Sequence, residues 1–461
     1  WASGPSSGTP AGSPARAALS AAVLPTVPSY DPWAWIVWGR ELLDPHLSFA
    51  TGGGPSWKPL PVVFTTVFSL FGGAAPTLWV VAARAAGLLG LVAAWRLASR
   101  VAGGRGPAAA IAGLVAVLGL LLTQDFFYYM FRGTSEPALV ASVLWSVELL
   151  LARKHLGAFA ALVAAALLRP EAWPFLGIYA IWLWLRRPRL RPWVIAGLAL
   201  VPLVWFVPPW IGSGQPFQAA GHARAYNGHL GSAPVLTALN RALDLQIVPV
   251  LVGAAVAVAW RDRLVRGLAA GALVWVAIVV ATVIDGYPGL ERFFLPAAAI
   301  LCVLAGVGFA RVTLLAPGTL ASAAAAAALI GVSAPLAAAR IDAVRDAKPA
   351  ADQAVRVLDQ LSDAARAAGG HAGVFPCRSS FAAVNHGVQT ALAWKLRVTL
   401  GRIGTALGKP GVDFVGPHNA VDGIAAPIGA PLTVRELVAQ AGVWRVLRVT
   451  EPGRSDRCVG R

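Results

Sequence analysis

The sequence predicts an all-α polytopic membrane bundle of about 11 transmembrane helices, followed by a small C-terminal α/β domain outside the membrane. Three observations support this fold class. Of the 461 residues, 57% are hydrophobic and 13% are charged, and the mean hydropathy is +0.66, whereas about a quarter of the residues of a soluble domain are charged. Apolar runs recur along most of the chain, which favours helices over a barrel. The turns between these runs alternate in charge.

The stretch from Ser29 to Pro61 is expected to be the first external loop, lying flat on the membrane surface. It opens with Asp31 at the end of an apolar run, continues as a tryptophan-rich helix that contains Glu41, and reaches a cationic block at Lys58. Asp31 is interpreted as a helix N-cap and also as a candidate general base, because a carboxylate among aromatic rings at a membrane boundary usually has a function.

Two short apolar segments flank this loop. Ala15–Val27 is interpreted as the end of a first span, and Leu60–Phe71 as a re-entrant or surface helix, because 12 residues of helix cover only about 18 Å. External loop helices are thus expected over about residues 30–72. Further spans are predicted at Ala75–Leu97, Ala108–Leu122, Ala138–Leu151, Leu156–Leu168, Trp173–Leu185, Val194–Trp210, Ile247–Trp260, Leu268–Ile284, Phe293–Ala310 and Leu320–Ala339.

The charges between the predicted spans fall into two sets. One set of turns is almost purely cationic, which assigns it to the cytoplasm and explains the net charge of +17 without nucleic acid. The other set mixes acids and bases and is expected to face outward, as an active site at the outer membrane surface would. This outer set comprises Asp125, Arg132 and Glu136; Arg169 and Glu171; His222, Arg224 and His229; and Asp285, Glu291 and Arg292.

Several of these charged residues have structural alternatives. Asp125 is as consistent with a plain loop end as with a site, and Glu136 directly precedes a span where a neighbouring hydroxyl would cap the helix. Arg169 and Glu171 flank a proline inside an apolar stretch, so both charges need partners. Arg84 lies within the second predicted span, where a role inside the bundle is expected.

The sequence contains no strong motif for binding a metal ion or a nucleotide. The sequence has no HExxH motif, no CxxC pair and no histidine cluster, and His222 and His229 in one loop are a weak signal. Aspartate, glutamate and histidine would suit a divalent cation, yet nothing requires one. No Walker loop or dinucleotide fingerprint occurs in a suitable context, so no cofactor is required by this sequence.

From residue 341 the composition becomes that of a soluble domain, which separates residues 1–340 from 341–461. An amphipathic helix is predicted at Pro349–Ala368, with β-like runs at Ala372–Phe375 and Trp444–Val449. The capping-box pattern Thr433-x-x-Glu436 predicts a further helix before the last strand.

An odd number of spans places this domain outside the cell, where thiols are oxidised. We therefore expect a disulfide between Cys377 and Cys458, whereas Cys302 lies within a predicted span. Two reduced thiols in a cytosolic tail are the alternative, because pairing does not follow from sequence alone.

An external aspartate after the first span, followed by an Arg-Glu-Leu helix, resembles the glycosyltransferase superfamily of GT-C fold. Lys58 stands where that superfamily often has histidine or proline in a His-Pro-Pro-Leu-type turn. The ordered matches cover roughly residues 29–300. They are Asp31, Trp57-Lys58-Pro59-Leu60-Pro61, Ala83-Arg84-Ala85, Ser135-Glu136-Pro137, Leu168-Arg169-Pro170-Glu171 and Arg292-Phe293-Phe294-Leu295-Pro296.

The resemblance implies a multi-pass plasma-membrane enzyme that takes a sugar, such as mannose or arabinofuranose, from a polyprenyl-phosphate carrier. It would pass the sugar, with inversion, to a glycan, glycolipid or protein acceptor on the extracytoplasmic face, with Asp31 as base and Asp125 as second candidate. The expected phosphate-binding cations are Arg169, Arg292, Lys58 and Arg84, and the secondary or acceptor-side residues are Glu41, Glu136, Glu171 and His222.

Two other classes of function remain open from the sequence. Many spans with buried charges are also typical of a transporter or flippase, although no inverted repeat is visible. A catalytically silent relative that serves as a binding scaffold is the second, and such a protein would have no need of the Asp31 carboxylate.

Overall fold

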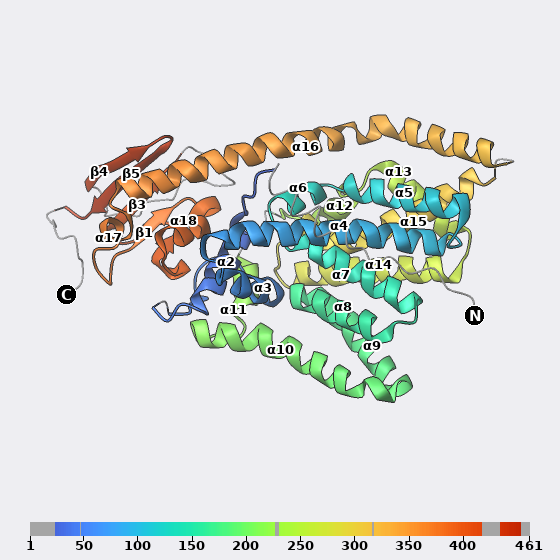
Figure 1. Ribbon diagram of the computed structural model, residues 1–461, viewed down its shortest axis with the longest axis horizontal. Helices are drawn as coiled ribbons and strands as arrows, with labels where there is room; N and C mark the ends of the chain where they lie inside the picture. Colours follow the sequence, from blue (N-terminus) through green and yellow to red (C-terminus); the bar gives the residue numbers. More distant parts are fainter. Residues whose placement is uncertain (1–23, 47, 226–229, 316–317, 417–433, 453–461) are drawn as a thin grey trace, which may run out of the picture. The chain divides into compact units, whose positions relative to one another are not determined.

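The computed structural model of the chain describes residues 24–46, 48–225, 230–315, 318–416 and 434–452. The chain divides into two compact units, whose elements are labelled in Figure 1. The first unit consists of Trp1–Thr26, Val80–Gly197 and Asn227–Ala347. The second consists of Val27–Trp79, Leu198–Tyr226 and Lys348–Arg461. The second unit therefore joins the opening loop with the C-terminal part of the chain.

The first unit is helical. Its helices are α4 (Ala75–Val101, which begins in the second unit), α5 (Gly106–Leu121), α6 (Phe126–Phe131), α7 (Glu136–Leu151), α8 (His155–Leu168), η2 (Pro170–Ala172), α9 (Trp173–Arg186), η3 (Pro188–Leu190), α12 (Pro234–Asp244), α13 (Val248–Ala259), α14 (Arg263–Ile284), η4 (Glu291–Phe294) and α15 (Leu295–Thr313). Two further helices, α10 (Arg191–Ser213) and α16 (Thr319–Ala367), continue into the second unit.

Helix α15 forms the centre of the first unit, since it packs against α5, α7, α13 and α14 and is buried over most of its length. Two glycines on α15 allow neighbouring backbones to approach closely. A Cβ at Gly306 would lie 2.2 Å from the carbonyl oxygen of Ala112, and one at Gly308 would lie 2.0 Å from that of Gly253. Close packing through small residues is typical of helices in membranes.

The described residues hold five helices that are long and apolar enough to cross a membrane, or six if α12 and α13, bent by 92° at their break, count as one span. These five helices are Gly72–Val101, Pro188–Ser213, Arg263–Ile284, Glu291–Thr313 and Ala323–Ala367. The predicted apolar runs do form helices, but several, including α5 and α8, are shorter than the roughly 20 residues that a span needs. The predicted number of spans is therefore not confirmed. Most of the first predicted segment, 15–27, lies outside the described residues.

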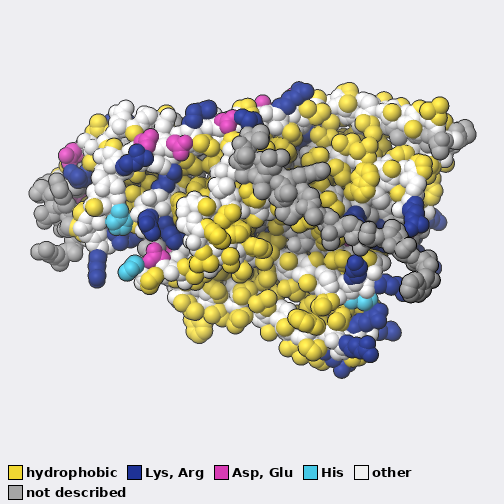
Figure 2. Space-filling model, in the orientation of Figure 1, with side chains coloured by type: hydrophobic (Ala, Val, Ile, Leu, Met, Phe, Trp, Pro, Cys, Tyr) yellow, Lys and Arg dark blue, Asp and Glu magenta, His cyan; other side chains and the backbone are white. Residues whose placement is uncertain are grey.

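The outer surface of these helices is apolar. Figure 2 shows hydrophobic side chains over α8, α9 and α10, with Lys and Arg gathered where α9 ends and α10 begins. Ile178 and Ile181 of α9 are 71% and 63% exposed. Such side chains favour a lipid environment.

The second unit combines helices with one sheet. Its helices are α2 (Tyr30–Glu41), α3 (Pro59–Ser69), η1 (Gly72–Ala74), α11 (Gln218–Ala225), α17 (Gly370–Val374), η5 (His386–Val388), α18 (Gln389–Leu396) and η6 (Leu400–Arg402). Its strands are β1 (Ala382–Val384), β2 (Ile403–Gly404), β3 (Gly411–Val415), β4 (Val434–Ala441) and β5 (Trp444–Thr450).

The strand order is β2-β1-β3-β5-β4. The first three strands are parallel, with Ala383 opposite Gly404 and Asp413, and β5 pairs antiparallel with both β3 and β4. One face of the sheet rests on α16, where the Trp444 indole donates a hydrogen bond to the carbonyl of Val357. The small α/β domain is thus present, together with the predicted last strand.

Three local predictions for this part of the chain are wrong. The run Ala372–Phe375 falls largely within helix α17, and Glu436 lies in strand β4, whereas Thr433 is outside the described residues. Strand β4 forms because it pairs with β5 through the turn at Gly442, which has a φ of 54°. The helix predicted at Pro349–Ala368 is present as the end of α16, but its predicted start is wrong, because α16 is unbroken through residue 341 and Pro349.

The structure shows the oxidation state of two of the three cysteines. Cys377 is disulfide-bonded, and Cys302 is a free thiol buried in α15. The predicted partner, Cys458, lies outside the described residues. The pairing of Cys377 with Cys458 stays a prediction.

Candidate active site

The residues predicted for the site divide between the two units. The first unit contains Asp125, Glu136, Arg84, Arg169, Glu171 and Arg292, and the second contains Asp31, Glu41, Lys58 and His222.

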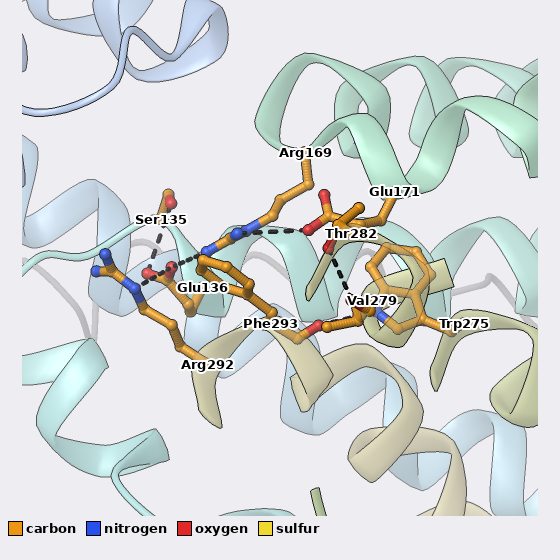
Figure 3. A network of polar contacts seen from close by, with 9 residues as sticks. All are labelled: Ser135, Glu136, Arg169, Glu171, Trp275, Val279, Thr282, Arg292 and Phe293. Carbon is orange, nitrogen blue, oxygen red and sulfur yellow. Dashed lines mark hydrogen bonds and ion pairs between the residues drawn. The ribbon is translucent and has the colours of Figure 1, made fainter. Parts of the chain in front are cut away.

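In the first unit, Glu136 is the centre of a buried ionic network, drawn in Figure 3. It is the first residue of α7 and is fully buried. Its Oε1 lies 3.1 Å from Nη2 of Arg169 and 3.9 Å from Nε of Arg292. Ser135 donates a long hydrogen bond of 3.5 Å to Oε2, and its hydroxyl caps no backbone N–H of α7. The network therefore joins the start of α7 to η2 and η4.

Arg169 is held in place from three sides. Nη1 lies 3.6 Å from Oε1 of Glu171, and the guanidinium carbon lies 3.8 Å from the centre of the Phe293 ring. The backbone turns to an extended conformation at Arg169 because Pro170 follows, which ends α8 and directs the side chain into the network. Among the described residues, its buried Nε has no hydrogen-bond partner, and neither has Oε2 of Glu171. Arg169 therefore keeps one unused donor in a buried, charged setting.

These distances bring Arg169, Glu171, Glu136 and Arg292 together in one network. The four side chains carry two positive and two negative charges. Buried charges are stable only when they are paired, which explains why each arginine has a carboxylate beside it.

The remaining two first-unit residues have other surroundings. Asp125 is exposed and has a φ of 59°, a conformation that aspartate tolerates better than most residues. Arg84 is buried in α4, donates a hydrogen bond to the carbonyl of Pro25, and lies 4.9 Å from the centre of the Phe131 ring.

An apolar groove of about 510 Å³ lies in the first unit, and sequence analysis did not predict it. Its walls come from α7, α8, α9, α14 and α15, and its lining includes Val143, Leu162, Phe175, Tyr179, Trp182 and Trp275. Residues from five helices form it, so no local sequence pattern marks it. A cavity of this size and lining suits a long hydrocarbon chain.

The groove reaches the ionic network through Trp275. The indole N–H of Trp275 donates a 2.8 Å hydrogen bond to the carbonyl of Phe293, whose ring lies under Arg169. Phe175, which also lines the groove, stacks on Trp275 at 5.7 Å. The apolar groove is thus connected to Arg169 through two residues, Trp275 and Phe293.

In the second unit, Asp31 lies in the first turn of α2 and is half-buried. It is not the N-cap as predicted: Ser29 occupies that position, and α2 begins at Tyr30, so that Asp31 is already helical. A carboxylate in the first turn interacts favourably with the helix dipole.

Lys58 is buried before α3, and its ammonium lies 5.3 Å from the centre of the Trp35 ring. The Trp35 ring in turn meets Trp79 edge-on at 5.5 Å, and the carbonyl of Trp35 accepts a 2.6 Å hydrogen bond from Thr65. A Cβ at Gly39 would lie 2.5 Å from the backbone of Thr65, so α2 and α3 are in close contact. The aromatic loop helix is therefore a packed element rather than a loose surface segment.

Glu41 and His222 hold the loop after α2. Glu41 is 3% exposed and accepts a 3.0 Å hydrogen bond from the backbone N–H of Ala50. Burial raises the pKa of its carboxyl to about 8. His222 contacts Gln218 at 3.2 Å, and Gln218 donates to the carbonyl of Thr51. These contacts give both residues a positioning role.

Glu148 is a buried acid that the sequence analysis did not single out. It is 1% exposed on α7 and accepts two 2.8 Å hydrogen bonds from Arg100, while Arg96 lies 3.3 Å away. A lone carboxylate inside an apolar run was the signal available. Because both carboxylate oxygens already face arginine, this cluster is a structural ion pair that joins α4 and α7.

No group of three or more His, Cys, Asp or Glu side chains that would suit a metal ion occurs among the described residues. Positive charge at the candidate site comes from arginine and lysine side chains.

Two solved structures share the fold of this chain. ArnT from Cupriavidus metallidurans bound to undecaprenyl phosphate aligns with a TM-score of 0.61 at 16% identity, over 95% of this chain and 97% of that chain. The same protein in the apo state aligns with a TM-score of 0.55 at 15% identity, over the same shares. No protein-family model matches the sequence, and no curated protein matches it. The structural likeness confirms the GT-C fold that the sequence resemblance implied.

Proposed function

We propose that this chain, with the GT-C fold now established, is a membrane glycosyltransferase that takes its sugar from a polyprenyl-phosphate donor. The observation that carries the proposal is the apolar groove that is linked to Arg169 through Trp275 and Phe293. The solved structure with the same fold contains undecaprenyl phosphate, a ligand of the same chemical class.

In this proposal the isoprenoid tail occupies the groove and the phosphate approaches the arginines. Arg169 keeps a buried Nε donor, so it can bind a phosphate oxygen without giving up its contacts to Glu136 and Glu171. The two carboxylates hold the guanidinium in place before the substrate arrives, which lowers the entropic cost of binding. Lys58 and Arg84 are further cations proposed to act on the donor.

The proposed reaction is a single displacement. The carboxylate of Asp31 takes the proton from an acceptor hydroxyl while that oxygen bonds to the anomeric carbon. The bond from the anomeric carbon to the phosphate oxygen breaks, and the polyprenyl phosphate leaves as an anion stabilised by the cations. Attack opposite the leaving group inverts the anomeric configuration. We propose further that the site faces outward, as the cationic turns suggest, and that the acceptor is a cell-envelope glycan, glycolipid or protein.

Transfer of a radiolabelled sugar from a synthetic polyprenyl-phosphate donor, by the purified chain in lipid nanodiscs, tests the proposal. A panel of mannosyl and arabinofuranosyl donors is appropriate, because the donor sugar is not yet defined. Arg169→Gln should lower donor use at least about tenfold, since a charged hydrogen bond to phosphate contributes about 1.5–3 kcal/mol. Arg311→Gln, which breaks an ion pair with Asp262 elsewhere in the first unit, is the matched control and should retain activity.

The results distinguish a glycosyltransferase from the two alternative functions, a flippase and a catalytically silent scaffold. Movement of the lipid donor across the bilayer without sugar transfer would indicate a flippase. Donor binding without turnover in the parent protein would indicate a silent scaffold. Equal donor use by the parent and by Arg169→Gln would remove Arg169 from the proposed phosphate site.

A further inference from the structure

Asn385, directly after β1, is a buried polar residue that the proposed mechanism does not use. Asn385 is 1% exposed, and neither Oδ1 nor Nδ2 of its side chain has a hydrogen-bond partner in the part of the chain that the structure describes. Its backbone stays extended, with φ −56° and ψ 153°. Buried side-chain amides in folded proteins are nearly always hydrogen-bonded, so an amide with two unmet atoms indicates a ligand or a functional constraint.

The sheet topology places Asn385 at a position where α/β sheets commonly bind ligands. After β1 the chain passes through α18 to β2 on one side of β1, and it then returns to β3 on the other side. The direction in which successive strands are added to the sheet therefore reverses between β1 and β3. Ligands bind outside the carboxyl ends of parallel strands at such a reversal. Asn385 is the first residue beyond the carboxyl end of β1.

Asp413 on β3 is a second buried group with an unmet atom nearby. It is 1% exposed and lies opposite Ala383 in the sheet, and its Oδ1 has no hydrogen-bond partner among the residues described. Asn385 is two residues beyond Ala383, the residue that pairs with Asp413. Strand spacing and rise put the Cα atoms of Asn385 and Asp413 about 8 Å apart. One small ligand can therefore reach both.

The loop after β1 is also attached to the start of α2. The ring of His386 lies 4.0 Å from that of Tyr30, with an angle of 31° between their planes. The Tyr30 hydroxyl donates to Oε1 of Gln389 at 2.8 Å, and Thr390 donates to the carbonyl of Tyr30 at 2.8 Å. Asp31 is the next residue along the chain, so these contacts fix Asn385 and His386 close to the proposed base.

We propose that Asn385, beyond the carboxyl end of β1, and Asp413 of β3 bind a sugar ring of the acceptor through its hydroxyl groups. The Asn385 amide both donates and accepts, as neighbouring hydroxyls require, and the Asp413 carboxylate adds an acceptor. The exposed ring of His386 provides a flat surface beside the sugar. The proposal rests on the glycosyltransferase function and deepens it, because it makes the C-terminal domain the acceptor-binding part and the acceptor a carbohydrate.

The first test uses Asn385→Leu in the full chain. Leucine has a similar shape and no polar atoms, so thermal unfolding should occur at an unchanged or higher temperature, because no partner is left unpaired. The acceptor KM should rise about tenfold or more, the effect of losing one or two hydrogen bonds to a neutral ligand, while the donor KM stays unchanged. An unchanged acceptor KM would overturn the proposal.

Gln246→Leu is the matched control. Gln246 is also a buried amide, but it donates to Thr123 at 2.9 Å and to the carbonyl of Ala298 at 3.3 Å. Its replacement should lower the unfolding temperature and leave the acceptor KM unchanged. A rise in acceptor KM for this variant as well would mean that the effect at Asn385 is not local, and would overturn the assignment.

Direct binding separates this inference from the proposed function. Saturation-transfer NMR on the chain in nanodiscs, with methyl α-mannopyranoside and methyl α-arabinofuranoside as probes, should give a signal with the parent and with Asp31→Asn. Asn385→Leu and His386→Ala should weaken it. Probe binding without any sugar transfer would support this site and reject the proposed reaction. Transfer in the parent without a loss of probe binding in Asn385→Leu would support the reaction and reject the site.

Discussion

Nη2 of Arg40 donates a 2.8 Å hydrogen bond to the backbone carbonyl of Val398, a residue 358 positions further along the chain. Nη1 of the same side chain donates to the carbonyl of Trp394 at 3.1 Å, and the guanidinium lies 5.0 Å from the Trp394 ring. The opening loop helix and the C-terminal domain are thus one packed body, joined through α2 and α18. Two segments that look separate in the sequence depend on each other for stability.

Arg40→Gln should destabilise the second unit by about 2–4 kcal/mol, because two carbonyls lose charged hydrogen bonds in a buried site. Thermal unfolding is monitored by tryptophan fluorescence, because the ring centres of Trp33 and Trp394 lie 6.3 Å apart across this contact. Arg397→Gln is the control, because Arg397 is exposed on the same segment and should have little effect. Equal unfolding temperatures for parent and Arg40→Gln would contradict the prediction.

The stability of the second unit should depend on pH through Glu41. Burial raises the pKa of this carboxyl from an ordinary 4.5 to about 8, so the folded state holds the proton more tightly than the unfolded state. Its contribution to stability is therefore present below about pH 4.5 and is lost progressively as the pH rises to about 8. Glu41→Gln mimics the protonated form, and it should match the parent near pH 5 and unfold at a higher temperature near pH 8.

Glu436→Gln is the control for this pH dependence, because the Glu436 carboxylate is 64% exposed. Burial also raises the pKa of Asp413, to about 6, so the stability that Asp413 contributes is likewise lost as the pH rises. The difference between parent and Glu41→Gln therefore isolates Glu41. If the difference in unfolding temperature between the parent and Glu41→Gln is the same near pH 5 and near pH 8, Glu41 does not titrate in this range.

Asp31→Asn should lower turnover by about 10²–10⁴-fold, the usual contribution of a general base, and should retain donor binding. The amide keeps the size of the side chain but cannot take up the acceptor proton. Sugar transfer and donor binding are measured on the same preparation, with Asp44→Asn as a control just beyond the same helix. Normal turnover would exclude Asp31 as base and make Asp125 the next residue to change. Loss of donor binding as well would indicate a structural role.

Gly271→Leu should reduce the use of long-chain donors more than that of short-chain donors. Gly271 lines the groove on α14, and nothing lies within 4 Å of a Cβ added there, so leucine fills the groove without disturbing its neighbours. Gly177 on α9 is equally open but does not line the groove, which makes Gly177→Leu the matched control. Transfer rates are compared for donors of increasing isoprenoid length. The same rate profile for both variants would place the tail elsewhere.

Much of the helical content followed from the sequence alone. Each apolar run from Ala75 onward forms a helix, because a run of apolar residues in lipid satisfies its backbone hydrogen bonds only by coiling on itself. The proline after Arg169 marked a break, and the isolated charges of Arg169 and Glu171 marked a site that needed partners. These are local signals, so tertiary structure did not override them.

The sequence determined that acids and bases such as Glu136 and Arg292 had to find one another, since buried charges cannot stay unpaired. Only the tertiary structure decided the partners, the groove beside Trp275, and the attachment of Arg40 to Val398. It also made Val434–Ala441 a strand, against a helix-capping pattern, because β5 offered it a pairing partner. Such features depend on contacts between residues far apart in the chain, whose free energy no local pattern encodes.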